Sequence, residues 1–266
     1  MNLSAMFIGL AASAAMLIST SANAGLKREV ITYKVGETEV SSVLIGDANA
    51  GAKPGLVLIP NWMGINEANL KQAELIANMG YVVLVADMYG KSLRPKDAAE
   101  AGKISGEIKS DRALMRARVN AALAQLISAG KTKKVSLDAS KLGAIGFCFG
   151  GTAAIEMARS GANVAGVVSF HGGLSASATL AIIGFKASVL ALHGADDPYV
   201  PAEEVTAFQS EMRVAKANWE LVSYGGAVHS FTDVDAKMEG QAHYDKKVAK
   251  RAYARMHNFF GELFGK

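Results

Sequence analysis

Residues 142–158 constrain the fold more than any other part of the chain. An apolar run suited to a buried strand ends at Gly146, Cys148 follows two positions later, and Gly150-Gly151 precedes a helix-like segment. A strand that reverses into a helix within about two residues strains the central residue and needs small neighbours. The spacing Gly-x-Cys-x-Gly therefore predicts a tight strand-to-helix turn with the cysteine at its tip.

The same turn would give Cys148 a reactive environment. Its sulfur would lie at a helix N-terminus, where unpaired N–H groups favour an anion and hence a thiolate. The alternative is a structural role, since a lone cysteine is most often a small buried hydrophobe. The flanking glycines favour the nucleophile, and both interpretations depend on what else the chain brings near the sulfur.

The first 24 residues contain no charged side chain and resemble a secretory signal peptide. An apolar run over residues 6–18 is followed by small polar residues and by Ala22-Asn-Ala24, an A-x-A cleavage pattern. The start lacks the Lys or Arg of a usual n-region, and the alternative is a membrane anchor, for which the run is short. We expect cleavage after Ala24 and a periplasmic or secreted mature chain. A lone free thiol is at risk of oxidation in such a compartment, so its presence favours a functional role for Cys148.

Length, composition and charge indicate the number of domains and the kinds of partner that the chain can have. The 266 residues, half of them hydrophobic, show no linker, so we expect one domain over residues 25–266. The formal charge of +4 is dispersed and is not interleaved with aromatics, which argues against a nucleic-acid partner. Beyond the leader no apolar stretch is long enough for a membrane span, so we expect no membrane contact after cleavage.

Strand and helix patterns alternate along the mature chain. Residues 29–35 and 38–45 flank the turn signal Gly36-Glu37 and predict an antiparallel hairpin at a sheet edge. Short continuous apolar runs then alternate with helical periods, which is typical of a mostly parallel sheet covered on both faces, an α/β fold. The predicted strands are 56–59, 81–86, 142–145, 164–170, 187–192 and 219–224, and the predicted helices are 67–79, 111–129, 202–216 and 243–264.

Reactive side chains follow three of these strands. Cys148 follows the third, Asp196 and Asp197 follow the fifth, and His229 lies on a glycine-rich loop after the sixth. Sites in such sheets form beyond the carboxyl ends of the strands, so we expect these groups to converge. The chain order of nucleophile, acid and histidine is that of an α/β-hydrolase triad, with either aspartate able to serve.

The chemistry explains why all three groups are needed. A thiol is only slightly ionised at neutral pH, so a histidine must take its proton and return it to the leaving group. An aspartate on the other ring nitrogen fixes the tautomer and stabilises the imidazolium. Two backbone N–H donors must meet the oxyanion, and we assign these to Phe149 and Trp62.

Five motifs follow one another along the chain: Pro60-Asn-Trp-Met-Gly-Ile-Asn66, Ala86-Asp-Met-Tyr-Gly90, Gly146-Phe-Cys-Phe-Gly-Gly151, His193-Gly-Ala-Asp-Asp-Pro-Tyr-Val-Pro201 and His229-Ser-Phe231. Together they resemble the dienelactone hydrolase family, from about residue 30 to the C-terminus. The resemblance implies an α/β-hydrolase fold and a triad of Cys148, His229 and Asp197, because the family pattern His-Gly-x-x-Asp places the acid four residues after the histidine. Asp196 is then a neighbour.

Two positions depart from the family pattern. Asn61 stands where members typically carry a glutamate thought to help set the protonation of the cysteine, so thiol activation should depend on His229 and the helix terminus. Asp233 stands where dienelactone hydrolase itself has an arginine that helps to bind the substrate carboxylate. This departure implies that anionic dienelactones are not the preferred substrates.

The remaining predictions concern the substrate pocket and the other histidines and arginines. We expect five loop residues to form the substrate pocket: Asn61, Met63, Tyr89, Tyr199 and Phe231. We also expect His193 to be a core residue and His171 to be either pocket or core. His243 and His257 are expected at the surface of the last helix, and Arg112 and Arg116, four residues apart, on an exposed helix face.

We therefore expect a hydrolase of a small ester or lactone that acts through a thioester at Cys148. No clustered histidine and carboxylate pattern indicates a metal, and no glycine-rich motif indicates a nucleotide cofactor, so we expect neither. The acyl substrate and the oligomeric state stay open. The alternatives are another acyl substrate, such as a thioester or an acetylated sugar, and a non-catalytic ligand-binding or redox-sensing relative in which Cys148 reacts with oxidants.

Overall fold

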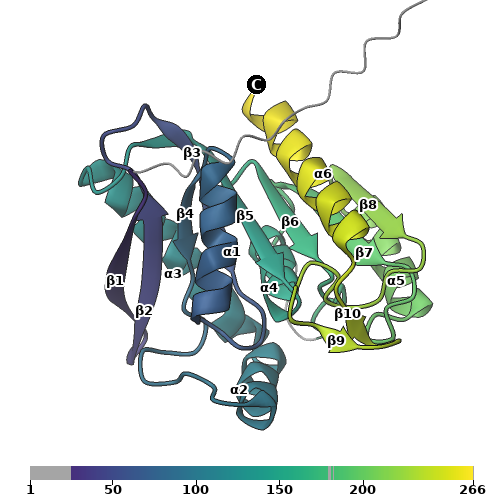
Figure 1. Ribbon diagram of the computed structural model, residues 1–266. Coiled ribbons are helices and arrows are strands. Elements are labelled where there is room, and N and C mark those ends of the chain that lie inside the picture. Colours follow the sequence, from purple (N-terminus) through teal and green to yellow (C-terminus); the bar gives the residue numbers. More distant parts are fainter. Residues whose placement is uncertain (1–24, 179–180, 182, 266) are drawn as a thin grey trace, which may run out of the picture.

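The computed structural model describes residues 25–178, 181 and 183–265, and the expected signal peptide lies outside this part. Eight strands form the main sheet, in the order β1-β2-β4-β3-β5-β6-β7-β8 (Figure 1). The strands are β1 (Lys27–Val35), β2 (Thr38–Gly46), β3 (Lys53–Ile59), β4 (Val82–Val85), β5 (Leu137–Phe147), β6 (Gly166–Phe170), β7 (Ser188–Gly194) and β8 (Trp219–Tyr224).

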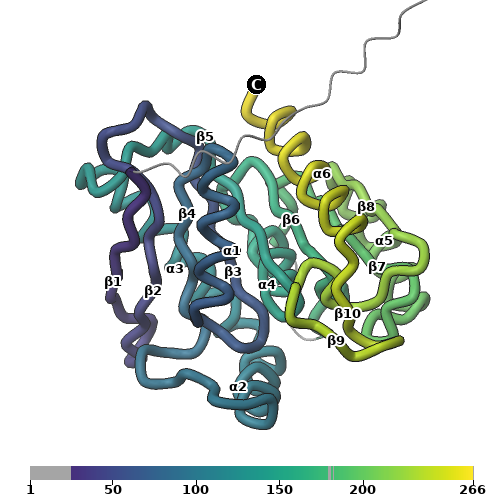
Figure 2. The backbone as a smooth tube through the Cα atoms, in the orientation of Figure 1, coloured from purple at the N-terminus to yellow at the C-terminus, as the bar shows by residue number. Residues whose placement is uncertain are grey.

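The sheet is antiparallel only at its N-terminal edge. β1 pairs with β2, and β2 with β4, in antiparallel register, whereas every pair from β4 to β8 is parallel. The tube in Figure 2 follows the chain from the purple hairpin at this edge to the yellow C-terminal helix. The predicted mostly parallel α/β sheet with an N-terminal hairpin is therefore confirmed. Because the parallel strands share a direction, their carboxyl ends meet at one edge.

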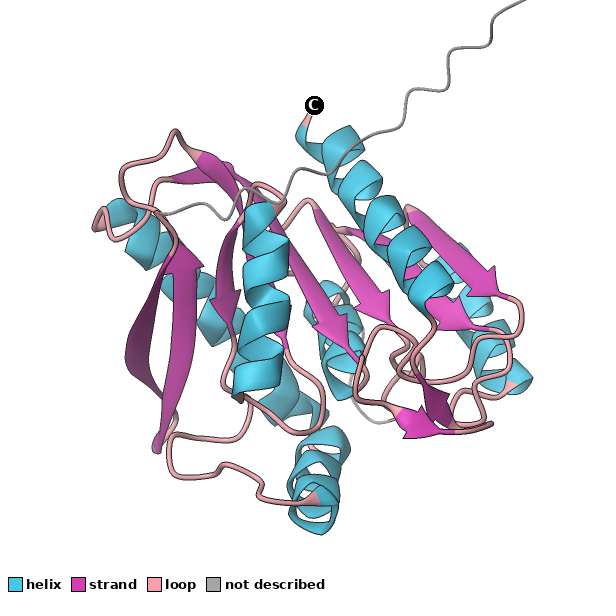
Figure 3. Cartoon of the chain, viewed as in Figure 1, coloured by secondary structure: helices cyan, strands magenta, loops and turns pink. Residues whose placement is uncertain are grey.

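Helices cover both faces of the sheet, as the cyan and magenta layers of Figure 3 show. On one face α1 (Glu67–Asn78) and α6 (Lys246–Phe264) contribute to one apolar cluster, for example through Ile76 and Phe260. On the other face α3 (Arg112–Lys131), α4 (Phe149–Arg159) and α5 (Ala202–Val214) contribute to a second cluster. Near-continuous apolar strands are thus buried from both sides, as a parallel sheet requires.

The structure adds elements that periodicity did not predict. Helix α2 (Ala98–Ser110) starts at Asp97, whose side chain accepts the Glu100 N–H at 2.9 Å. An Asp-x-x-Glu sequence is a helix-start signal that could have revealed it. The last helix begins at Lys246 and not at residue 243, because His243 belongs to a short hairpin, β9 (Lys237–Met238) and β10 (Ala242–His243).

One helix ends later than predicted. α3 continues through Gly130 to Lys131. A Cβ on this glycine would lie 2.8 Å from Cδ2 of Leu137 on β5. Gly130 thus allows the close packing of a helix on a strand and does not end the helix.

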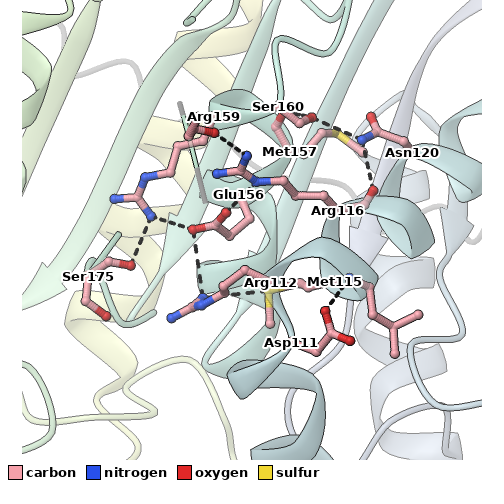
Figure 4. Close-up of polar contacts among 12 residues, drawn as sticks. Asp111, Arg112, Met115, Arg116, Asn120, Glu156, Met157, Arg159, Ser160 and Ser175 are labelled. Carbon is pink, nitrogen blue, oxygen red and sulfur yellow. Dashed lines mark hydrogen bonds and ion pairs between the residues drawn. The ribbon is translucent and has the colours of Figure 1, made fainter. Parts of the chain in front are cut away.

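A buried ion network joins the helices behind the sheet (Figure 4). Glu156 of α4 accepts hydrogen bonds from Arg116 Nε at 2.7 Å and from Arg159 Nη1 at 3.0 Å, and Arg112 Nη1 lies 4.0 Å away. Arg159 also donates to Glu211 of α5 at 2.6 Å. The predicted exposed arginine face is therefore wrong, because the buried carboxylate of Glu156 draws Arg112 and Arg116 inward.

Candidate active site

Cys148 is the single residue between strand β5 and helix α4, with φ 55° and ψ −118°. A non-glycine residue in this region costs on the order of 1–3 kcal/mol. The glycines around it are required by close backbone approach. A Cβ on Gly146 would lie 1.9 Å from the Gly150 carbonyl oxygen, and one on Gly150 would lie 2.1 Å from that of Ile59. The predicted strand-to-helix turn is therefore present.

The structure brings Cys148, His229 and Asp197 together in one row. The sulfur of Cys148 lies 3.0 Å from Nε2 of His229, and Nδ1 of His229 lies 2.8 Å from Oδ2 of Asp197. Asp197 is 4% exposed and His229 9% exposed, while Cys148 is half-buried. Asp196 is exposed, so the structure places only one of the two aspartates against the histidine.

Backbone hydrogen bonds hold the acid and the base of this row in place. The other oxygen of Asp197 accepts the Tyr199 backbone N–H at 2.9 Å. The His229 N–H donates to the Gln241 carbonyl at 3.1 Å, and the His229 carbonyl accepts the His243 N–H at 3.0 Å. The β9–β10 hairpin, which sequence patterns missed, thus fixes the backbone of His229. In Figure 1 this hairpin lies at the edge to which the arrowheads of β5 and β6 point.

The surroundings of His229 favour its charged form. Burial alone would lower its pKa, but the hydrogen bonds to Asp197 and Cys148, and the charges of both groups, raise the pKa to about 10. An imidazole with this pKa is protonated at neutral pH. The proton can come from the neighbouring thiol, so the arrangement can hold a thiolate paired with an imidazolium.

Backbone donors for an oxyanion can come from two segments beside the sulfur. Phe149 is the first residue of α4, where N–H groups have no partner within the helix. The segment after β3 lies against the same turn, because a Cβ on Gly150 would also meet the Pro60 carbonyl oxygen at 2.6 Å. The Trp62 carbonyl in that segment accepts the hydroxyl of Tyr89 at 2.7 Å, which fixes the loop that we expected to supply the second donor.

The expected pocket residues differ in their placement. Tyr199 is 53% exposed, and its ring centroid lies 5.1 Å from that of His229. Met63 is half-buried, and Tyr89 is buried with its ring 5.6 Å from that of Phe149. Phe231 differs from the expectation. It is 0% exposed and packs in the core, where its ring meets those of His171 and Tyr224.

The other histidines occupy distinct environments. His193 is buried, as predicted, and burial lowers its pKa. His171, left open between pocket and core, is also buried and lies behind the turn, where its Nδ1 accepts the Cys148 backbone N–H at 3.2 Å. His257 is half-buried and contacts the Tyr81 hydroxyl. His243 is exposed, but on β10 and not on the last helix.

Over residues 25–178, 181 and 183–265, no three His, Cys, Asp or Glu side chains are grouped so that they could hold a metal ion. In the same ranges no helix combines the length and apolarity needed to cross a bilayer.

Comparison with known proteins assigns the family. The model of the dienelactone hydrolase family matches residues 40–264. This chain belongs to the dienelactone hydrolase family. A dienelactone hydrolase-like promiscuous phosphotriesterase from metagenomic libraries is 37% identical, with a TM-score of 0.81, over 90% of this chain and 99% of that one.

Two further relatives agree with this assignment to the dienelactone hydrolase family. The structure named m3DLH is 36% identical with a TM-score of 0.82, over 90% of this chain and 99% of its own. A Bradyrhizobium protein named as a probable 2-oxo-3-(5-oxofuran-2-ylidene)propanoate lactonase is 29% identical over 68% of this chain and 74% of its own. The chain is accordingly a carboxylic-ester hydrolase with the α/β-hydrolase fold, and its substrate is a small-molecule ester.

The two departures from the dienelactone hydrolase family pattern meet in the structure. Nδ2 of Asn61 lies 3.4 Å from Oδ2 of Asp233, while Oδ1 of Asn61 accepts from the Asn69 side chain and the Met63 N–H, both at 3.0 Å. The Asn61 side chain thus hydrogen-bonds to Asp233 and to its own segment, whereas the sulfur of Cys148 contacts His229. A negative charge lies where the family resemblance implies a positive one.

Proposed function

We propose that this protein hydrolyses a small, uncharged ester or lactone, with Cys148 as nucleophile, His229 as proton carrier and Asp197 as the group that orients His229. One observation carries the proposal. Sγ of Cys148 lies 3.0 Å from Nε2 of His229, and Nδ1 of His229 lies 2.8 Å from Oδ2 of Asp197. These residues follow three different strands, and hydrogen bonds hold the loops of the acid and the base.

The chemistry proceeds in two halves. The Cys148 thiolate attacks the carbonyl carbon, and the backbone N–H groups of Phe149 and Trp62 stabilise the oxyanion. As the carbonyl re-forms, the ester C–O bond breaks and Nε2 of His229 gives its proton to the leaving oxygen, which leaves a thioester. Water then loses a proton to Nε2 and adds to the thioester. Collapse releases the acid and restores the thiolate beside the imidazolium.

The charge at the site supports an uncharged substrate. Asp233 is half-buried and contacts Asn61, the residue before the proposed oxyanion donor Trp62. A carboxylate there repels a substrate carboxylate and cannot form the ion pair that an arginine would provide. Thioesters and acetylated sugars share the required acyl group, so they belong in the same substrate screen.

A phosphotriester is a second candidate substrate class. The relative that is 37% identical is named as a promiscuous phosphotriesterase. The same thiolate would attack phosphorus and the P–O bond to the leaving group would break, with Nε2 of His229 giving its proton to the departing oxygen. The same two N–H donors would stabilise the charge that develops on the phosphoryl oxygen. Dephosphorylation would then need water to attack a phosphorylated Cys148.

Steady-state assays with p-nitrophenyl esters test the proposal. Cys148→Ala should abolish turnover, and His229→Ala should lower it by about 10²- to 10⁴-fold. Neutral short esters and lactones, anionic butenolides, thioesters, acetylated sugars and paraoxon then rank the substrate classes. No turnover by the native protein, together with ready sulfenic acid formation at Cys148, would favour a redox sensor.

We also propose that the mature protein is exported. The leader residues 1–24 carry the features of a secretory signal peptide, with an apolar run over residues 6–18 and the A-x-A pattern Ala22-Asn-Ala24. N-terminal sequencing of the protein from a periplasmic fraction should begin at Gly25. A cytoplasmic protein that keeps its leader would contradict the proposal.

A further inference from the structure

Backbone strain concentrates at the site. In the part of the chain that the structure describes, five non-glycine residues have positive φ, and three of these are Cys148 at 55°, His171 at 40° and Ser230 at 56°. Two of these strained angles have an evident reason: Cys148 lies in the strand-to-helix turn, and Ser230 lies beside His229. His171 is the third, directly after strand β6. A strained backbone angle persists only where the surrounding structure stabilises it, and such angles are often found at functional sites.

The ring of His171 touches both reactive loops. Its Nδ1 lies 3.2 Å from the Cys148 backbone nitrogen, and its Nε2 lies 2.7 Å from Oγ1 of Thr232, three residues after His229. The Cys148 N–H is shared between Nδ1 and the Phe170 carbonyl oxygen, which lies 3.0 Å away, and because this N–H points to Nδ1, that ring nitrogen carries no proton. A neutral ring therefore carries its proton on Nε2 and donates it to Thr232.

The contact continues into the core. Thr232 also hydrogen-bonds to the hydroxyl of Tyr253 on α6, which accepts from Gln72 on α1 at 2.9 Å. The backbone N–H of His171 donates to the Leu192 carbonyl of β7 at 2.8 Å. The backbone of His171 is thus tied to β7, and its ring is linked through Thr232 and Tyr253 to both helices of one sheet face.

His171 also packs directly on the proposed proton carrier. Its ring centroid lies 5.2 Å from that of His229, and the rings meet edge to face at 67°. The titratable residues in contact with His171 are Cys148 on the turn, through its backbone N–H, and His229 on its loop, while Tyr253 on α6 lies beyond Thr232. Burial and the charge of His229 lower the pKa of His171 well below its ordinary value, so no second cation opposes the imidazolium.

We propose that His171 is a positioning residue that sets the distance between the Cys148 sulfur and Nε2 of His229 by bonding to the loops of both. The inference rests on the proposed function, since it concerns the same reaction. The Cys148 backbone is also held by the Phe170 carbonyl, so loss of the Thr232 bond is what frees the loop of His229 and lets the imidazole move away from the sulfur. The thiolate is then less well paired, and proton transfer to the leaving group is slower.

Paired variants break the Thr232 end of this bridge from both sides. Thr232→Val removes the hydroxyl at nearly constant shape, whereas Thr232→Ser keeps it. His171→Asn tolerates positive φ and offers an acceptor to Cys148, but its shorter side chain does not reach Thr232. Thr232→Val and His171→Asn should each lower kcat about tenfold with KM nearly unchanged, since a 1.4 kcal/mol loss in the transition state alone is tenfold in rate. Thr232→Ser should restore kcat.

The decisive readout is the pH profile of Cys148 alkylation by iodoacetamide. Thr232→Val should move its midpoint upward by about one unit, a tenfold change in the ionisation equilibrium. Val119→Ala, in the core cluster of the opposite face, is the control for stability alone and should lower Tm without moving the profile. A lower Tm with an unmoved profile and unchanged kcat in both bridge variants would overturn the proposal.

The alkylation profile does not require turnover. If Cys148→Ala keeps full esterase activity, the proposed function fails, and the profile still reports whether His171 positions the thiol. If Cys148→Ala is inactive and only the profile is unmoved, the positioning role alone fails.

Discussion

Nδ1 of His229 lies 2.8 Å from Oδ2 of Asp197, and both side chains are buried. A buried carboxylate at this distance holds the imidazole in one tautomer and stabilises its protonated form. The balance between burial and the partners of His229 leaves its pKa at about 10. The ionisation of this ring is therefore the first property to measure.

The ring of His229 should stay protonated through neutral pH and titrate near pH 10. NMR of the ring protons, recorded from about pH 6 to about pH 11 on either side of that value and of the ordinary histidine pKa, follows this directly. Asp197→Asn removes one partner charge and Cys148→Ala the other, so each should lower the midpoint. A native midpoint near the ordinary value would mean that the row of contacts does not stabilise the imidazolium.

The turn around Cys148 should tolerate no side chain at Gly150. A Cβ there would lie 2.1 Å from the Ile59 carbonyl oxygen, and backbone atoms cannot yield cheaply. Gly150→Ala should lower the free energy of unfolding by more than about 2 kcal/mol and impair activity. Gly106→Ala on α2 is the matched control, because nothing lies within 4 Å of its Cβ. It should stabilise by roughly 0.5 kcal/mol, and equal effects in urea unfolding would refute this packing argument.

Glu156 should be required for stability. It is the carboxylate to which Arg116 and Arg159 both bond, and it is fully buried. Glu156→Gln leaves the buried guanidinium of Arg116 without its counter-charge, whereas Arg159 keeps Glu211, and the substitution should cost about 3–5 kcal/mol. Glu262→Gln breaks an exposed pair with Arg255 and should cost less than about 1 kcal/mol. Similar denaturation midpoints for both variants would contradict the network's role.

Asp233 should set the charge preference of the substrate. Asp233→Asn removes one negative charge beside Asn61 but keeps an oxygen for the Asp235 N–H, which Asp233 binds at 3.0 Å. The ratio of kcat/KM for an anionic ester to that for a neutral ester of matched size should rise about fivefold, the effect of roughly 1 kcal/mol. Asp235→Asn, which is exposed, serves as the control. An unchanged ratio would place Asp233 outside substrate recognition.

The sheet and the grouping of Cys148, His229 and Asp197 could be predicted because both depend on local sequence signals. Buried strands read as apolar runs, and Cys148, Asp197 and His229 stand directly after such runs. Parallel topology then brings them to one edge without any knowledge of packing.

What sequence analysis missed depends on contacts between distant segments. The arginines of α3 are buried because Glu156 meets them from another helix, 40 residues away from Arg116 in sequence. The β9–β10 hairpin has strands of two residues each, too short for any periodicity, and its bonds go to the His229 backbone. The side chain of His171 is directed by a strained backbone angle that no residue pattern encodes.

The most direct test of the account is whether an acyl group is carried by Cys148. Acid-quenched mass spectrometry of the native protein, mixed with excess p-nitrophenyl ester, should find the acyl group on the peptide that contains Cys148. His229→Ala should prolong this adduct once it has formed, because water loses its general base. An unmodified Cys148 during turnover, or turnover that survives Cys148→Ala, would contradict the account.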